Sequence, residues 1–412
     1  MKASPRIHVP SLLQFALNGL ALTTTLPLVL FVLTLAAAQL FADQTIPLNI
    51  GVLLSFAWTG AFISLLLAPG IVLALFRLFG HQPPRLLQGS PLRLATIALA
   101  FWPVILLAGW VSSTRDVLPW LALPPLQVLT VALPLWWFIE IGRYKLLQGS
   151  AQRGWGVFSL GMLLGPALSM VVELILIVIL IVGVGIWVSA QPDLMRELQR
   201  IFTQLEGLDP QSPRALELLR PYLTNPGVIG TALLVISGFI PMIEELIKPL
   251  PVLILALWRK LPPAEGFAAG LLAGGAFGLI ESLGTAINLQ GEDWAPVLAM
   301  RAGTGLLHVV STGLVSWGIA SAIHDKRWLR LLLSYLAAVS LHGLWNMGAV
   351  IAGGSDLNLG QEYTGLIIAA SILLGLVALA LYAILVSMNR RLRPAAPTAA
   401  AAPDLNQIQE GK

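Results

Sequence analysis

The chain has 412 residues, of which 57% are hydrophobic and only 11% are charged, and its mean hydropathy is +0.84. This composition excludes a soluble globular domain and predicts an all-α polytopic membrane protein. The absence of cysteine excludes disulfides, thiolate metal sites and cysteine nucleophiles. The formal charge of +4 is small, and we expect it to reflect basic loops on the cytoplasmic side rather than nucleic-acid binding. The apolar composition makes the lipid bilayer the expected partner.

Apolar runs of about 20 residues, the length that crosses a bilayer as a helix, recur along the chain. The runs are continuous rather than alternating, and lipid offers no partner for free backbone groups, which together favour helices over a β-barrel. The sequence therefore predicts about ten transmembrane helices, at residues 20–42, 50–78, 92–112, 119–141, 155–189, 228–258, 265–289, 296–323, 328–352 and 363–388.

Lysine and arginine gather in every second loop, whereas the opposite short loops carry mainly aspartate and glutamate. Basic loops stay on the cytoplasmic side, so we expect both termini to face the cytoplasm and the chain to lie in the cell membrane, plasma or inner. The N-terminus lacks a cleavage site after a short apolar core, which predicts a retained first span.

The chain divides by composition into four regions. Apolar residues between Leu194 and Leu205 recur with helical spacing among polar ones, which predicts an amphipathic helix on the outer membrane surface, a cap over a site or a plain solvated connection. The predicted regions are an N-terminal five-helix membrane region at 1–190, an extracytoplasmic amphipathic segment at 191–227, a five-helix catalytic core at 228–388 and a disordered cytoplasmic tail at 389–412.

Four consecutive spans of the core contain polar residues, which are costly inside a membrane and by default mark a functional site. Glu244 precedes the cytoplasmic Arg259 by fifteen residues, and the corresponding separation is fifteen or sixteen residues for Glu281, His308 and His342. At about 1.5 Å per residue, all four lie roughly 22–24 Å from the cytoplasmic helix ends. Adjacent helices can therefore bring them together at one depth.

The carboxylates of this group outnumber the nearby cations. Lys248 can meet Glu244 or Glu245 on one helix face. The carboxylates that remain must be protonated, hydrated or balanced by a bound cation. Zinc held by Glu281, His308 and His342 would be one solution, with an open fourth position of the catalytic kind.

These residue types can also hydrolyse a peptide bond. A carboxylate beside a confined water is a general base, and the amide of Asn346, one turn from His342, can donate to a developing oxyanion. Midplane carboxylates and broken helices are also typical of transporters and proton-coupled carriers, which stay an alternative. A degenerate protein that only binds membrane proteins is a third interpretation.

Four motifs follow one another within about residues 228–352. They are EExxK at Glu244–Lys248, FxxxE at Phe277–Glu281, the span histidine His308, and HGxxN at His342–Asn346. Their order resembles the PrsW family of intramembrane proteases, which is related to the type II CAAX prenyl proteases and the bacterial Abi group. Ser282 stands where members often have asparagine, and Asn346 where many have aspartate. A glutamate at Glu281, rather than the histidine of prenyl proteases, favours the PrsW branch over a prenyl protease-like enzyme.

The resemblance implies an intramembrane endopeptidase, metallopeptidase or glutamic-type, that cuts a membrane-anchored protein on the outer side of the membrane. Anti-sigma factors are the substrate type of the family. The catalytic set that it implies is Glu244, Glu245, Glu281, His308, His342 and Asn346.

Overall fold

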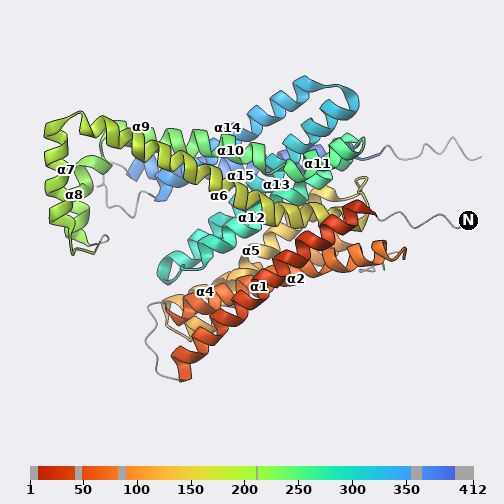
Figure 1. Cartoon of the computed structure of the whole chain (residues 1–412), viewed down its shortest axis with the longest axis horizontal. Coiled ribbons are helices and arrows are strands. Elements are labelled where there is room, and N and C mark those ends of the chain that lie inside the picture. The colour runs from red at the N-terminus through yellow and green to blue at the C-terminus, as the bar shows by residue number, and fades with distance from the viewer. Residues whose placement is uncertain (1–7, 42–48, 82–89, 210–211, 354–363, 395–412) are drawn as a thin grey trace, which may run out of the picture.

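The computed structural model describes residues 8–41, 49–81, 90–209, 212–353 and 364–394. Within these ranges the secondary structure is helical, without strands. In the described part of the chain, ten helical stretches are long and apolar enough to cross a membrane, which confirms the all-α polytopic class and the predicted number of spans. In Figure 1 the long helices lie side by side, with α12 and α13 in the middle of the molecule and α1 and α2 along one edge. The disordered tail predicted at 389–412 begins too early, because the last helix continues to Leu392, and residues 395–412 lie outside the described residues.

The first five spans differ from the prediction in two places. The first helix begins at Val9 instead of residue 20. The third span is broken at Phe101 into two helices, because Pro103 in the first turn of the second cannot donate a backbone hydrogen bond. The helices of this region are α1 Val9–Phe41, α2 Ile50–Leu78, α3 Pro91–Ala100, α4 Trp102–Thr114, α5 Pro119–Arg143 and α6 Ala151–Ser189.

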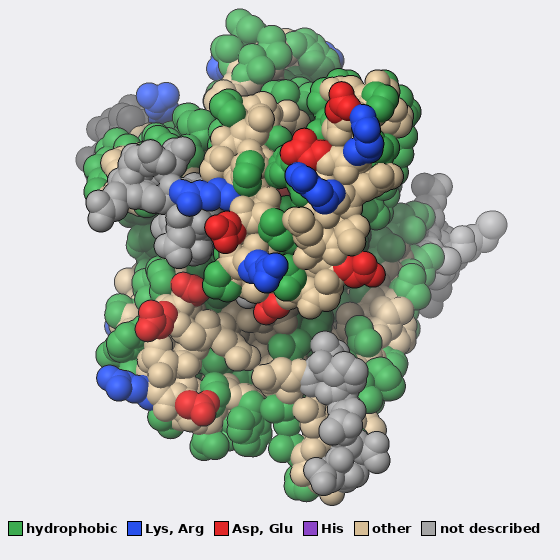
Figure 2. All heavy atoms as spheres, turned by 90° about the vertical axis from the view of Figure 1, so that its left-hand side faces the viewer, with side chains coloured by type: hydrophobic (Ala, Val, Ile, Leu, Met, Phe, Trp, Pro, Cys, Tyr) green, Lys and Arg blue, Asp and Glu red, His purple; other side chains and the backbone are tan. Residues whose placement is uncertain are grey.

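Two short helices follow α6 and lie together at one end of the molecule (Figure 1). The first, α7 Pro192–Leu205, confirms the helix that the spacing of apolar residues predicts. The second, α8 Pro213–Leu223, was not predicted. The Tyr222 hydroxyl of α8 donates to Glu197 of α7 at 2.6 Å, which joins the pair. Figure 2 views the molecule from this end, where acidic and basic side chains gather.

The remaining spans form the C-terminal part of the bundle. The sixth is interrupted twice, by a π-helical segment before Pro241 and by a turn at Lys248–Pro249, as its three prolines predict. Its pieces and the helices that follow are α9 Pro226–Leu234, η1 Val235–Phe239, α10 Ile240–Ile247, α11 Leu250–Trp258, α12 Pro263–Ala286, η2 Gly291–Asp293, α13 Trp294–Asp325, α14 Trp328–Gly353 and α15 Thr364–Leu392.

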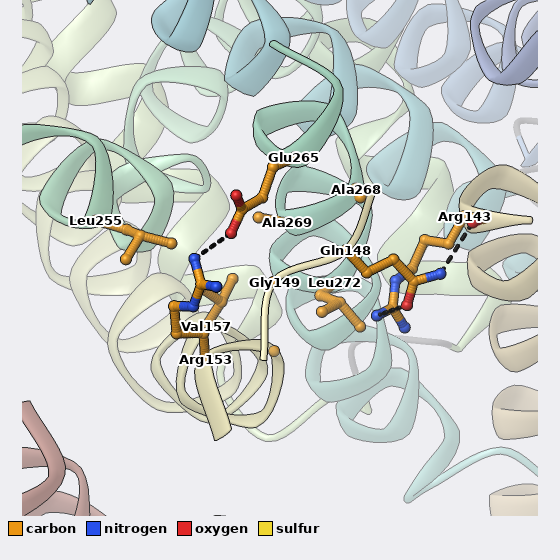
Figure 3. A pocket seen from close by; sticks show the side chains of 11 residues that line it. Arg143, Gln148, Gly149, Arg153, Val157, Leu255, Glu265, Ala268, Ala269 and Leu272 are labelled. Carbon is orange, nitrogen blue, oxygen red and sulfur yellow. Dashed lines mark hydrogen bonds and ion pairs between the residues drawn. The ribbon is translucent and has the colours of Figure 1, made fainter. Parts of the chain in front are cut away.

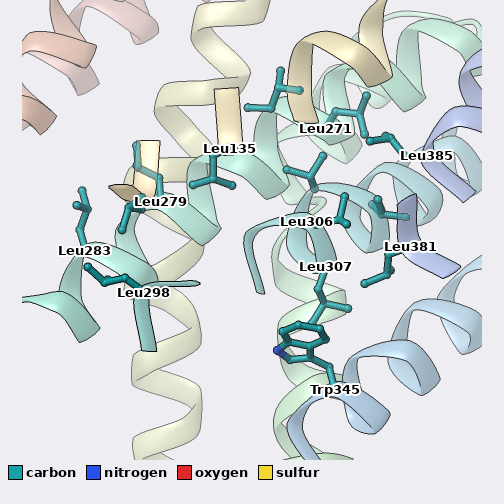
Figure 4. Close-up of a cluster of buried hydrophobic side chains, with 14 of the residues drawn as sticks. Leu135, Leu271, Leu279, Leu283, Leu298, Leu306, Leu307, Trp345, Leu381 and Leu385 are labelled. Carbon is teal, nitrogen blue, oxygen red and sulfur yellow. The ribbon is translucent and has the colours of Figure 1, made fainter. Parts of the chain in front are cut away.

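Helices α12 and α13 are the centre of the bundle. In the most apolar stretch of each, 83% and 89% of residues are buried, against 6% in α6, whose apolar surface is left for lipid. Leucine side chains from α5, α12, α13 and α15 meet Trp345 of α14 in one cluster, drawn in Figure 4. These central helices therefore hold their positions by packing against protein on most sides.

A ladder of small residues brings α12 and α13 into close contact. Glycines at four-residue spacing lie on one face of α12, and a Cβ added to Gly274 would clash with the backbone carbonyl of His308. A Cβ added to Gly278 would meet the His308 ring at 3.0 Å. Close backbone approach of this kind is typical of small-residue helix contacts in membranes. The paired positions are Gly266 with Ala320, Gly270 with Ser316, Gly274 with Thr312 and His308, and Gly278 with His308.

The N-terminal region is tied to this centre by polar contacts at one end of the bundle. Arg153 of α6 forms an ion pair with Glu265 of α12, and Arg143 of α5 donates to Gln148 at 2.7 Å. Figure 3 shows these side chains around a small pocket between the helices. Asn389 of α15 donates to the Gly142 carbonyl at 2.8 Å. The first five spans and the last five therefore pack as neighbours.

The ladder predicts that Gly274→Ala destabilises the protein, by about 1–3 kcal/mol, because the new methyl group meets backbone that cannot move aside. Gly284→Ala is the matched control, since Gly284 is an exposed glycine of the same helix with open space around its Cα. Alanine there should be neutral or stabilising, through its higher helix propensity. Thermal unfolding in detergent measures both, and equal midpoints would contradict the ladder.

Candidate active site

Four helices bring the predicted site residues to one buried point. Helix α10 carries Glu244 and Glu245, α12 carries Glu281, α13 carries His308 and α14 carries His342. Glu244, Glu245, His308 and His342 are all buried, and the two imidazole rings meet edge to face with centroids 5.4 Å apart. The site residues, which the sequence predicts at one depth in the membrane, therefore lie close together in the structure.

The Lys248 ammonium lies at the centre of this group. Its side chain is fully enclosed, with Nζ 2.7 Å from Glu244 Oε2 and 2.8 Å from Glu245 Oε1. The same Nζ is 2.8 Å from His308 Nδ1 and 3.4 Å from His342 Nδ1. An ammonium can only donate, so His308 Nδ1 accepts and its proton is on Nε2. One cation thus contacts both carboxylates of the first motif and both histidines.

Glu245 orients His342. Its Oε1 lies 2.8 Å from His342 Nδ1, and a hydrogen bond to a carboxylate places the imidazole proton on that nitrogen. The lone pair is therefore on Nε2, which lies 3.8 Å from Glu244 Oε2. A histidine held by a carboxylate on one nitrogen and free on the other is the usual arrangement of a metal ligand.

Glu281 is the most accessible carboxylate of the group. Its side chain is 36% exposed, against 10% for Glu244. Oε2 lies 2.5 Å from His308 Nε2, and Oε1 pairs with Arg301 Nη2 at 2.9 Å. Glu281 is thus held from two sides and still reachable.

Arg301 is the residue that sequence reasoning missed as part of the site. Its Nε donates to Ser282 Oγ at 3.1 Å while its Nη2 pairs with Glu281. Ser282, where the family often has asparagine, therefore supports the arginine. The available signal was spacing, because Arg301 precedes His308 by two helical turns and lies on the same side of α13.

The aromatic residue of the FxxxE motif packs inside the site. The Phe277 ring lies 5.3 Å from the His308 ring and 4.8 Å from the Lys248 ammonium, both measured from the ring centroid. The second contact is a cation–π interaction, which is strongest where the cation is removed from water. Phe277 therefore fixes the positions of both groups.

The HGxxN motif docks α14 on the π-helical segment. Asn346 donates from Nδ2 to the Ile236 carbonyl at 2.9 Å. Gly343 faces the Ser237 carbonyl so closely that a Cβ would clash. One amide hydrogen of Asn346 is thus engaged in a helix–helix bond, and its oxyanion role stays a prediction.

Glu244, His308 and His342 are the residues whose ligand atoms converge, all within 4.8 Å of one another. This group differs in one member from the predicted set, which has Glu281 instead of Glu244. The donors are a carboxylate oxygen and two imidazole nitrogens, which zinc prefers, and Glu245 supplies the supporting carboxylate. Glu244 Oε2 is a buried atom with no hydrogen-bond partner among the described residues, although it lies in an ion pair with Lys248. The residues present therefore fit a divalent metal.

Comparison with known proteins gives one result. Residues 215–387 match the family model described as PrsW family intramembrane metalloprotease. No curated protein and no solved structure matches the chain. The matched range contains all of the converging site residues on α10, α12, α13 and α14. Residues 215–387 of this multi-pass membrane protein are therefore similar to the PrsW family of intramembrane metalloproteases.

Proposed function

We propose that the chain is a zinc-dependent endopeptidase that hydrolyses a peptide bond of a membrane-anchored protein within the bilayer. The observation that carries the proposal is the convergence of Glu244, His308 and His342 within 4.8 Å, with the more exposed Glu281 beside them. In this proposal the first three residues hold the metal, and Glu281 is the general base.

The contacts around the ligands support this assignment. His342 keeps its Nε2 lone pair beside Glu244 because Glu245 accepts the proton of Nδ1. His308 would hold the metal through Nδ1, the nitrogen that faces Lys248. When bound, zinc supplies Lewis-acid polarisation of the scissile carbonyl and a lower pKa for water.

Glu281 is placed to move the proton. It takes a proton from the attacking water, whose oxygen bonds to the carbonyl carbon, and then passes that proton to the nitrogen as the C–N bond breaks. Arg301 holds the carboxylate in place through its contact at 2.9 Å. Glu281 ends the cycle as it began, so one water is consumed per bond cut.

The surroundings of the site favour an unwound substrate. A peptide bond inside a helix is shielded by its neighbours, and an unwound segment in lipid needs polar partners for its backbone. Helix α10 is short and bounded by the π segment and by the turn at Lys248, which leaves non-helical backbone beside the carboxylates. We infer a membrane-anchored protein, such as an anti-sigma factor-like substrate, with Asn346 as a further donor to the oxyanion.

Glu281→Gln should abolish cleavage, by about 10²–10⁴-fold, because an amide cannot accept the proton. His342→Ala should do the same through loss of a ligand. Glu292→Gln is the matched control, since Glu292 is an exposed glutamate outside the site. New protein N-termini in membranes from cells expressing each variant, measured by mass spectrometry, report cleavage. The proposal fails if both site variants, inserted and folded, generate the same N-termini as wild type.

Metal analysis tests the ligand set directly. Purified wild type should retain about one zinc ion per chain, and His308→Ala should lose it. His324→Ala should retain it, because His324 lies at the far end of the same helix beside Asp325. Chelator should remove the metal and the activity together. Full activity in metal-free protein would instead indicate the metal-free glutamic mechanism.

A further inference from the structure

Glu173 is an ionisable residue in the middle of α6 that the mechanism above does not use. It lies outside residues 215–387, in the N-terminal region. Its Oε1 is buried and has no hydrogen-bond partner among the described residues. Arg301, the nearest site arginine along the chain, pairs with Glu281 and not with Glu173. A buried carboxylate oxygen without a partner is costly and requires an explanation.

The packing of α6 places Glu173 beside the site. Helices α6 and α12 run parallel, since Gly161 lies against Ala273 and Gly165 against Phe277. The same register, continued by one turn, sets Ser169 level with Glu281. Glu173 follows one turn beyond, on the same face of α6. The wall of the site on this side is therefore made by a helix of the N-terminal region.

Two unpartnered polar atoms stand on that wall. Ser169 is 3% exposed and its hydroxyl, like Glu173 Oε1, has no hydrogen-bond partner among the described residues. Helix α6 packs against both α10 and α12, the helices that carry Glu244 and Glu281. Buried polar atoms with several polar neighbours are the positions at which internal water is held.

We propose that Ser169 and Glu173 line a water-filled passage along α6 that delivers water to Glu281. Glu173 is a positioning residue in this scheme, since it binds water and does not touch the scissile bond. The inference rests on the proposed function, because only hydrolysis within the bilayer would require a supply of water that lipid cannot provide. It also gives the N-terminal region a role in the reaction.

The experiment uses single cysteines in the full chain, which contains no cysteine of its own. Ser169→Cys and Glu173→Cys probe the passage. Met170→Cys and Leu174→Cys are the matched controls, because these neighbours are 66% and 59% exposed on the lipid-facing surface of α6. Each purified variant in lipid nanodiscs is exposed to silver ion, a small water-borne thiol reagent. The thiol that remains is measured with a fluorescent maleimide after denaturation.

Cysteines at 169 and 173 should react at least about tenfold faster than those at 170 and 174, because silver reacts with hydrated thiolate and not with a thiol in lipid. Equal rates at all four positions would overturn the passage. This result does not depend on proteolysis, so it distinguishes failure of the passage from failure of the proposed function.

A second measurement tests the positioning role. Glu173→Gln keeps hydrogen-bonding capacity and should retain most activity, whereas Glu173→Leu should lower kcat by about tenfold with KM unchanged. Unfolding midpoints confirm that both variants fold. Unchanged kcat in Glu173→Leu would contradict the role of Glu173 in supplying water.

Discussion

The close contact between α12 and α13 is the constraint on which the site depends. Where lipid is as apolar as the side chains, helices gain little from the hydrophobic effect and associate through packing. The glycine ladder allows the backbone of α13 to lie against α12, so His308 reaches Gly278 and the pair His308–Glu281 forms. The other two site helices are then added to this pair, α10 through Lys248 and α14 through Asn346.

Much of this arrangement follows from the sequence. Hydropathy predicts ten spans because twenty apolar residues match the bilayer, and a common distance from the basic loops predicts that Glu244, Glu281, His308 and His342 meet. Pro241 and Pro249 predict the interruption of the sixth span, since neither can donate a backbone hydrogen bond. These features can be predicted from one sequence because each depends on the residues of a single helix and the loop next to it.

The contacts between side chains of different helices could not be predicted from the sequence. Spacing cannot decide whether Glu244 or Glu281 completes the group with the two histidines, because both lie at the same depth. The contact between Arg301 and Glu281 was missed for the same reason, because it joins side chains of two different helices. The place of Glu173 depends on the parallel register of α6 and α12, which no pattern within either helix encodes.

The buried ammonium of Lys248 offsets the carboxylates of the site with a cation that belongs to the chain itself. In small zinc domains the unfolded chain waits for the ion, because nothing else offsets the ligand charges. Here a covalently attached cation already contacts Glu244, Glu245 and both histidines. On the ligand set proposed above, the bundle would therefore assemble before the metal binds, and uptake of the ion would be a separate, later step.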